Sequence, residues 1–327
     1  MRRTLLLILV VSFFVAVTTA QSGPRARVVV GAGLNEPFAV DFDGAGRMFI
    51  AEMGGNRVSI WNRQAGLTPL AAPFNGPHHL ITGPNGDIYV ADTWAHMVRR
   101  VDPATGAVTR VAGTGQKGFS GDGGPALDAQ FGAAFAIAIH AGMLYIADLD
   151  NRRIRSVNLT SGIVGTVAGN GDTGVPVDGA DAKTQPLVDP RAVAVDATGQ
   201  IYICERGGHA LRVVDTQGRI RTVAGTGAPG AGGDGGPALK AALRGPKHIS
   251  IDTDGSVLIT DTENHVIRRY VPTKGTIERV AGTGQPGAAG LDGPPDQLQL
   301  NRPHGAIRYR GALYISDSEN HRVVAID

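Results

Sequence analysis

Six side chains at one recurring position of the sequence are the first candidates for chemistry. Five of them follow a proline directly, and the sixth follows Ala134, which stands where that proline would be. The set holds two imidazoles, one guanidinium, one ammonium group and two phenyl rings: Phe38, His78, Phe135, Arg191, Lys247 and His304. The next position adds His79 and His248, so four of the nine histidines fall in these two sets.

One chemistry that these residues could perform is metal-assisted catalysis. Neutral imidazoles are common ligands of divalent ions, so His78, His304 and His248 are candidate ligands for Zn²⁺, with His79 as an alternative to His248 and Ca²⁺ as the other ion considered. A bound ion would polarise a substrate oxygen or activate water. The candidate catalytic residues are then His248, Arg191 and Lys247, and the cations of Arg191 and Lys247 would stabilise developing negative charge.

A second chemistry is binding without catalysis. The same six residues would form a basic concavity with aromatic edges, which suits a small anionic ligand or an acidic peptide tail. We favour this interpretation and predict a ligand- or protein-binding module that acts through a channel mouth and its surrounding loops. A metal-dependent lyase or hydrolase is the alternative, so whether the protein is an enzyme stays open at this point.

An internal repeat predicts the elements that position these residues. An acidic residue closes each copy, at intervals of 56 or 57 residues after a first interval of 40: Glu52, Asp92, Asp148, Glu205, Asp261 and Asp317. Each copy contains four short apolar strands separated by turn residues, without a helix-length periodic segment. Four strands per repeat are typical of propeller blades. We therefore predict an all-β, six-bladed β-propeller whose innermost strands bring the six candidate residues to the rim of a central channel.

The two ends of the repeat region predict how the ring closes. The sixth copy stops after three strands, at residues 323–325. Near the other end, residues 28–33 resemble the fourth strand of the complete copies, such as residues 279–284. We expect residues 27–30 to supply the missing outer strand of the last blade. Such pairing would remove the exposed strand edge that an open ring would leave.

These repeats resemble the NHL-repeat family of β-propellers. Glu263-Asn264-His265 and Glu319-Asn320-His321 match the Asn-His core of its motif, and the resemblance covers essentially the whole chain after residue 20. It implies NHL-type four-stranded blades. The family includes protein- and RNA-binding modules, parts of cell-surface receptors and several enzymes, so the fold does not select one function.

Enzymes that resemble this family suggest roles for some of the candidates. In peptidylglycine amidating lyase, Pro-His motifs contribute zinc-binding histidines, and His78 and His304 match those motifs in type. In virginiamycin-type lyases a channel histidine acts as a base, a part that the resemblance would give to His248. The chain departs from the first in having one cysteine, Cys204, and therefore no intrachain disulfide. It also lacks, at the rim positions, the acidic metal cluster of gluconolactonase-like enzymes.

The first twenty residues match the pattern of a signal peptide. Arg2 and Arg3 precede an apolar run over residues 5–17, which is shorter than the ~20 residues that a membrane span needs. Small residues follow up to Ala20, where cleavage would occur. We therefore predict a signal peptide at 1–20, with an uncleaved anchor as the alternative, a propeller at 21–327, no membrane span after cleavage, and a secreted or periplasmic location.

Charge and cysteine content exclude several classes of partner and site. The formal net charge is +2, and Arg2 and Arg3 account for it, so the cleaved chain is neutral. Without a basic block, we expect no nucleic-acid partner. A single cysteine excludes multi-cysteine metal sites. We expect a monomer whose partner is a small anionic ligand or an extracytoplasmic protein or peptide.

Overall fold

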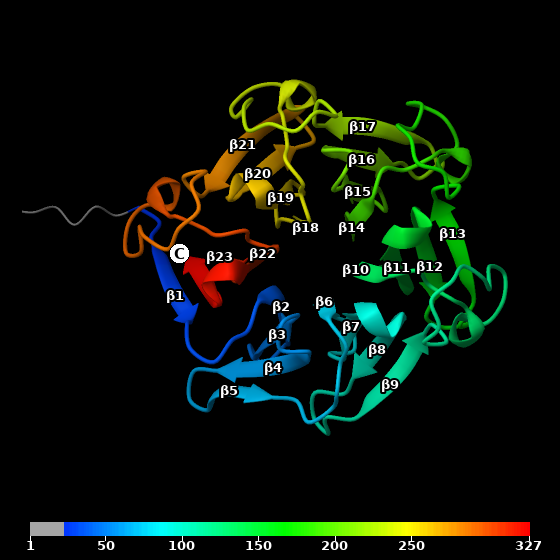
Figure 1. The fold of residues 1–327 in the computed structure, drawn as a ribbon, viewed down its shortest axis with the longest axis horizontal. Helices are drawn as coiled ribbons and strands as arrows, with labels where there is room; N and C mark the ends of the chain where they lie inside the picture. The colour runs from blue at the N-terminus through cyan, green and yellow to red at the C-terminus, as the bar shows by residue number, and fades with distance from the viewer. Residues whose placement is uncertain (1–22) are drawn as a thin grey trace, which may run out of the picture.

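The computed structural model describes residues 23–327, which form six four-stranded antiparallel sheets arranged as a ring (Figure 1). The predicted all-β, six-bladed propeller is confirmed. The predicted signal peptide lies outside the described residues. The first strand of each blade borders the central axis and the fourth lies at the outer edge.

The strands of the first three blades follow one another along the chain. Blade one contains β2 (Pro37–Phe42), β3 (Met48–Glu52), β4 (Arg57–Asn62) and β5 (Gly66–Pro69). Blade two contains β6 (Pro77–Thr82), β7 (Ile88–Asp92), β8 (Met97–Val101) and β9 (Val108–Ala112). Blade three contains β10 (Ala134–His140), β11 (Met143–Asp148), β12 (Arg153–Asn158) and β13 (Val164–Ala168).

The remaining blades repeat this order, except that the outer strand of the sixth comes from the start of the described chain. Blade four contains β14 (Pro190–Val195), β15 (Ile201–Glu205), β16 (Ala210–Val214) and β17 (Ile220–Ala224). Blade five contains β18 (His248–Ile251), β19 (Val257–Asp261), β20 (Val266–Val271) and β21 (Thr276–Ala281). Blade six contains β22 (Gly305–Tyr309), β23 (Ala312–Asp317), β24 (Arg322–Ile326) and β1 (Ala26–Val30).

The ring closes where β1 pairs with β24. The two strands are antiparallel, with Ala26 opposite Ile326 and Val28 opposite Val324. Beside this pair, Arg27 Nε donates to the Asp327 carboxylate over 2.6 Å. Both ends of the described chain are therefore held in one sheet.

Short 3-10 turns connect the strands at two kinds of position. Four follow the acidic residue that ends the second strand of a blade: η1 (Thr93–Ala95), η3 (Leu149–Asn151), η6 (Thr262–Asn264) and η8 (Ser318–Asn320). Four lie in the glycine-rich loops that lead to the next blade: η2 (Ala126–Asp128), η4 (Ala182–Thr184), η5 (Ala238–Lys240) and η7 (Pro295–Gln297). The described residues contain no helix longer than these turns. None of the turns has the length and apolar character of a membrane-spanning segment.

The recurring acids have a structural role in every blade. Each is fully buried and accepts a backbone N–H from the segment that precedes the innermost strand; Glu205, for example, accepts from Val188 over 2.7 Å. Each is also paired with an arginine of the third strand, as Glu205 is with Arg212 over 2.7 Å. The six acid–arginine pairs are Glu52–Arg57, Asp92–Arg99, Asp148–Arg155, Glu205–Arg212, Asp261–Arg268 and Asp317–Arg322.

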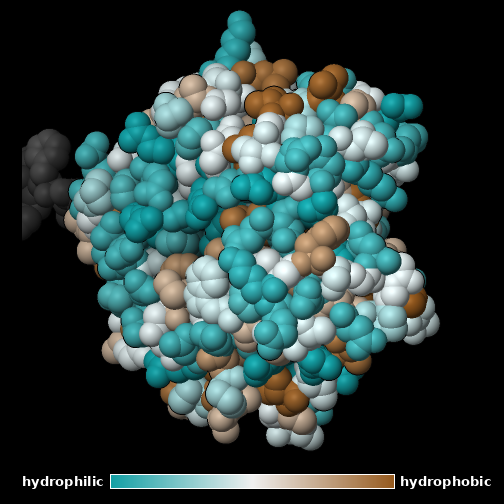
Figure 2. Space-filling view, turned by 45° about the vertical axis from the view of Figure 1, so that its right-hand side comes forward, coloured by the Kyte–Doolittle hydropathy of each residue, from teal (hydrophilic) through white to brown (hydrophobic). Residues whose placement is uncertain are grey.

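Apolar side chains and histidine latches join neighbouring blades. Ile137 and Ile146 of blade three, for example, share a buried cluster with Ala91 and Val98 of blade two. A latch is formed where His265 Nδ1 accepts the N–H of Arg302 from the next blade over 3.0 Å; His209 and His321 bond in the same way to Gly245 and Glu36. On the side of the molecule shown in Figure 2, hydrophobic side chains lie in small groups among hydrophilic ones. The core therefore lies between the blades.

Candidate functional site at the channel mouth

The six candidate residues lie together at one end of the channel, which we call the mouth. Phe38, His78, Phe135 and Arg191 are second in their strands, and each coincides with a shift of register against the next strand. Such a bulge redirects one side chain without ending the strand. Lys247 and His304 immediately precede β18 and β22. The start of each innermost strand thus contributes one side chain to the mouth.

Neighbouring aromatic rings of the mouth contact one another around the axis. The Phe38 ring stacks on His304 with centroids 3.8 Å apart, and meets His78 edge-on at 5.0 Å. His78 in turn meets Phe135 edge-on at 4.7 Å. The indole of Trp94, which is 44% exposed, lies edge-on to both His78 and Phe135. Trp94 is thus the aromatic residue through which the mouth is most open to solvent.

Arg191 is the residue of the mouth whose polar groups lack partners. Arg191 is 5% exposed, and its guanidinium carbon lies 4.1 Å from the centre of the Phe135 ring. The Arg191 Nε atom is buried without a hydrogen-bond partner, and within residues 23–327 no carboxylate lies within ion-pair distance of the guanidinium. The nearby Asp189 carboxylate is held instead by Arg206, over 2.7 Å. Burial and the charge of Arg206 lower the pKa of Arg191 to about 9, which still leaves it protonated at neutral pH.

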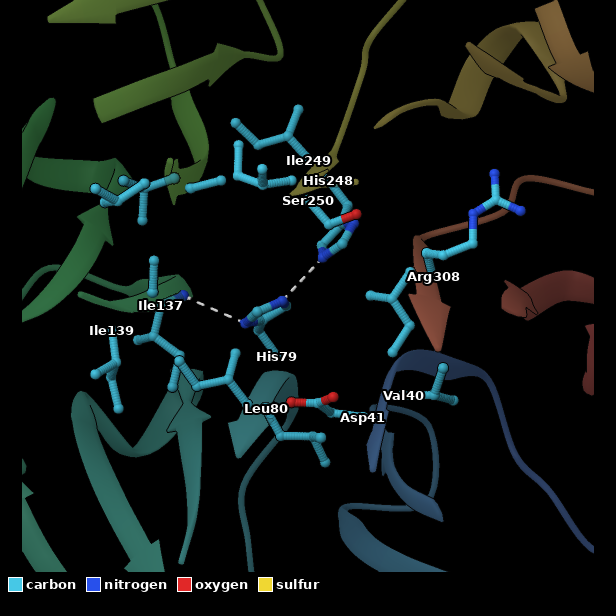
Figure 3. A pocket seen from close by; sticks show the side chains of 17 residues that line it. Val40, Asp41, His79, Leu80, Ile137, Ile139, His248, Ile249, Ser250 and Arg308 are labelled. Atoms are coloured by element: carbon cyan, nitrogen blue, oxygen red, sulfur yellow. Dashed lines mark hydrogen bonds between the residues drawn. The ribbon is translucent and has the colours of Figure 1, made fainter. Parts of the chain in front are cut away.

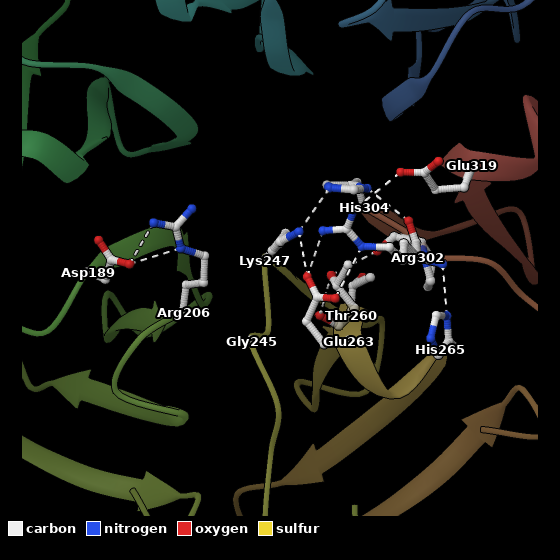
Figure 4. A network of polar contacts seen from close by, with 12 residues as sticks. Asp189, Arg206, Gly245, Lys247, Thr260, Glu263, His265, Arg302, His304 and Glu319 are labelled. Atoms are coloured by element: carbon white, nitrogen blue, oxygen red, sulfur yellow. Dashed lines mark hydrogen bonds and ion pairs between the residues drawn. The ribbon is translucent and has the colours of Figure 1, made fainter. Parts of the chain in front are cut away.

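Lys247, in contrast, belongs to a network of paired charges (Figure 4). Its Nζ lies 2.9 Å from Glu263 Oε1, and Arg302 reaches the same oxygen over 2.8 Å. Burial alone would raise the pKa of Glu263, but its hydrogen bonds to Arg302 and Lys247 lower it to about 2. Burial lowers the pKa of Lys247 to about 8. Glu319 also contacts Arg302, over 3.3 Å, so the surplus positive charge at the mouth is that of Arg191.

His78 and His304 are both neutral and hold their protons on Nδ1. His78 Nδ1 donates to the carbonyl of Gly76 over 2.7 Å, and His304 Nδ1 donates to the carbonyl of Arg302 over 2.9 Å. Burial, reinforced by nearby Arg191 and Lys247, brings both pKa values well below the usual value. The Nε2 of His304 faces the Lys247 ammonium at 3.4 Å, where it can accept a hydrogen bond.

The second histidine pair lies deeper along the channel and spans it. His79 comes from blade two and His248 from blade five, which lie opposite each other, and their Nε2 atoms are 2.9 Å apart (Figure 3). Both side chains are buried. Burial and the Arg191 charge lower the pKa of His248 to about 3, and burial together with the charges of His248 and Arg191 brings that of His79 well below its usual value. The sequence placed both in one ring of residues, but their direct contact depends on the width of the channel.

The three histidines considered as metal ligands do not meet in the structure. Phe38 lies between His78 and His304: it stacks on His304 and meets His78 edge-on. His248 pairs instead with His79. Residues 23–327 contain no group of three or more histidine, cysteine or acidic side chains placed to hold an ion. The unpaired cation of Arg191 also opposes a second cation at the mouth. His78, His304 and His248 are therefore not placed to share one metal ion.

Comparison with known proteins relates the chain to NHL-repeat proteins. No family model matches it. It is 28% identical to the Arabidopsis thaliana protein SUPPRESSOR OF QUENCHING 1, chloroplastic, over 78% of this chain and 25% of that protein. It is 25% identical to NHL repeat-containing protein 2 of Gallus gallus, over 93% of this chain and 46% of that protein. The chain therefore spans a quarter to a half of the length of these relatives.

Solved structures share the fold at low sequence identity. An auxiliary nutrient binding protein from Bacteroides ovatus has a TM-score of 0.69 and 17% identity, over 93% of this chain and 72% of that one. Virginiamycin B lyase from Staphylococcus aureus has a TM-score of 0.58 and 13% identity, over 93% and 98%. A putative gluconolactonase has a TM-score of 0.63 and 11% identity, over 94% and 92%. At these identities the likeness establishes the propeller fold alone.

Proposed function

We propose that this chain, which is an NHL-type β-propeller, is a binding module that takes a small anionic ligand at its channel mouth. The observation that carries the proposal is the buried Arg191 guanidinium without an acceptor. A buried charge that lacks a partner is strongly unfavourable, and it is retained where a ligand supplies the missing group. The charge of Lys247, by contrast, is already balanced by Glu263.

The ligand class follows from the shape of the guanidinium and its surroundings. A planar guanidinium binds a carboxylate or phosphate through two parallel hydrogen bonds. The Phe135 ring covers one face of the Arg191 guanidinium, so the edge of the guanidinium is the part left to bind an anion. Trp94 and Phe135 provide apolar surface beside it. A carboxylate joined to a small apolar or aromatic group therefore fits the mouth best.

The binding site is proposed to work outside the cytoplasm. The signal-peptide pattern of residues 1–20 supports this location. Amino-terminal sequencing of the protein secreted from its host should then start at Gln21. A chain that keeps Arg2 and Arg3 would contradict this part of the proposal.

Calorimetric titration tests the binding site. Acetate, benzoate and inorganic phosphate serve as anionic probes, and benzamide is the uncharged control for benzoate. We expect benzoate to bind the intact protein, benzamide not to bind at the mouth, and Arg191→Gln to weaken benzoate binding tenfold or more, because it removes charge-assisted hydrogen bonds.

A matched variant shows whether any loss is local to the mouth. Arg221 lies on the outer strand β17 of the same blade and is exposed, so Arg221→Gln makes the same chemical change far from the axis. It should leave benzoate affinity unchanged. Equal affinities for the wild-type protein and Arg191→Gln, or no binding of any anion at millimolar concentration, would refute the anion site.

A further inference from the structure

A second compartment of the channel lies beyond the histidine pair. Along the innermost strands, the mouth residues come first, His79 and His248 come next, and the residues that line this compartment follow. It is a pocket of about 270 Å³ that is open to solvent, and none of the six mouth residues lines it. We call it the inner cavity. His79 and His248 are among the residues that line it (Figure 3).

The wall of the inner cavity is largely apolar, and its two charged side chains, Asp41 and Arg308, already have hydrogen-bond or ion-pair partners. Aliphatic side chains from all six blades line it, among them Leu80, Ile137 and Ile249. The Asp41 carboxylate accepts the N–H groups of Phe42 and Thr82, over 2.8 and 2.6 Å. Arg308 is paired with Asp252 over 3.1 Å. The polar atoms whose bonding remains to be accounted for are the two facing Nε2 atoms.

The backbone contacts of each imidazole favour a proton on Nε2. The backbone N–H of Ile137 points at Nδ1 of His79 over 3.4 Å, and the N–H of Ala306 points at Nδ1 of His248 over 3.4 Å. A nitrogen that accepts a hydrogen bond carries no proton, and a neutral imidazole has one proton in total. If both backbone contacts form, both Nε2 atoms are protonated and two N–H groups face each other.

Without a ligand, no protonation state of His79 and His248 satisfies the two backbone contacts and the Nε2–Nε2 contact together. If one ring moves its proton to Nδ1, Nε2–H can donate across the axis, but that Nδ1–H then opposes a backbone N–H. A positively charged ring carries a proton on both nitrogens and has the same conflict. An oxygen atom that enters from the inner cavity and accepts from both Nε2–H groups resolves it, because every donor then has an acceptor.

We propose that the inner cavity is a second binding site, for a small uncharged molecule with a carbonyl oxygen that accepts from His79 and His248. A carbonyl fits better than a hydroxyl, because it accepts two hydrogen bonds and brings no donor of its own. An uncharged ligand fits because the charged groups of the wall already have hydrogen-bond or ion-pair partners. The volume lies below the ~300–1,000 Å³ of pockets for drug-sized ligands, so the molecule is about the size of a single ring.

Nitrogen NMR of ¹⁵N-histidine-labelled protein tests the proposal without any substitution in the pair. Cyclohexanone is the probe, and cyclohexanecarboxylate is the charged control. Saturation with cyclohexanone should bring both rings to the Nε2–H tautomer. A ring that keeps its proton on Nδ1 at saturation, or carboxylate binding in the cavity more tightly than the ketone, would overturn the proposal.

Variants separate this site from the anion site. His79→Phe and His248→Phe keep ring volume and remove one donor each, and they assign the two NMR signals. Each should weaken cyclohexanone binding by tenfold or more, whereas Arg191→Gln should leave it unchanged. Unaltered ketone affinity in both phenylalanine variants would show that the oxygen is not bound by the pair. Because benzoate and cyclohexanone report on different residues, failure of one site is distinguishable from failure of the other.

Discussion

The indole ring of Trp94 occupies the space that a side chain on Gly76 would need. A Cβ atom built on Gly76 would overlap the indole, and the glycine has a φ of +57°. The backbone N–H of Trp94 also donates to the carbonyl of Asn75 over 3.0 Å. The absence of a side chain at Gly76 therefore sets how closely the indole approaches the mouth.

Gly76→Ala should displace Trp94 and weaken binding at the mouth. The new methyl group collides with the indole, so we expect a shift of tryptophan fluorescence and a several-fold loss of benzoate affinity. Gly86→Ala is the matched control, because Gly86 has a φ of +85° and nothing within 4 Å of its Cβ position. It should cost about 1 kcal/mol of stability through backbone strain and leave affinity intact. Equal affinities in the two variants would separate Trp94 from the binding site.

Arg191→Met should leave the fold as stable as the wild type, or more stable. An unpartnered buried guanidinium contributes desolvation without a compensating ion pair, and an apolar side chain of similar length removes that penalty. Urea unfolding provides the comparison. A free energy of unfolding that falls by more than about 2 kcal/mol would mean that the guanidinium supports the fold, and a role in ligand binding would lose its main support.

Arg212→Ala should be strongly destabilising, because it leaves Glu205 buried without its cation. Removing one partner of a buried ion pair costs about 3–5 kcal/mol. Arg206→Ala is the comparison: its pair with Asp189 is partly exposed, with side chains 40% and 31% accessible, so a loss of no more than about 1 kcal/mol is expected. The double variant Glu205→Gln/Arg212→Met should recover much of the stability, and equal losses in the two single variants would contradict the structural role of the acids.

Stability should fall on acidification below pH 6.5 because the channel histidines stay neutral in the folded state. The pKa of His248 is lowered to about 3, so between pH 6.5 and 3 the unfolded chain binds a proton that the folded chain does not. That histidine then contributes a loss of up to about 1.4 kcal/mol per pH unit as the pH falls. Urea unfolding between pH 7 and 4 should show a shallower slope for His248→Phe than for the wild type.

A buried acid should change stability with pH in the opposite direction, and it serves as a control. Burial raises the pKa of Asp148 to about 6, so the folded state binds its proton more tightly than the unfolded chain does. Its contribution to stability is present below about pH 4 and is lost as the pH rises to about 6. Asp148→Asn should therefore make the acid-induced loss steeper. Parallel pH profiles for all three proteins would contradict these proton affinities.

The repeat predicted the blades because residues with the same structural role recur at the same position of each blade. Arg99, Arg155, Arg212 and Arg268 stand seven residues after their acids and all pair with them. In blades one and six, Arg57 and Arg322 reach the same carboxylates from five residues on. A fixed spacing misses these two pairs because a long, flexible side chain can reach one point from either backbone position.

The site was harder to predict than the fold because it depends on distances across the ring. The repeat placed Arg191 at the mouth, but its lack of a partner arises because Arg206 holds Asp189. The metal hypothesis assumed that His78, His304 and His248 would meet at one ion because all three lie near the start of innermost strands. In the structure Phe38 lies between the first two, and the channel is narrow enough for the third to meet His79.

The pairing of β1 with β24 makes folding order depend on the far end of the chain. Arg27 and Asp327, which bond beside this pair, are 300 residues apart. Strand β1 stays unpaired until β24 has been synthesised, so five blades can assemble before the ring is complete. A contact of such sequence separation forms late and slowly. Until then, the open edge of β24 is the part of the molecule most exposed to pairing with another chain.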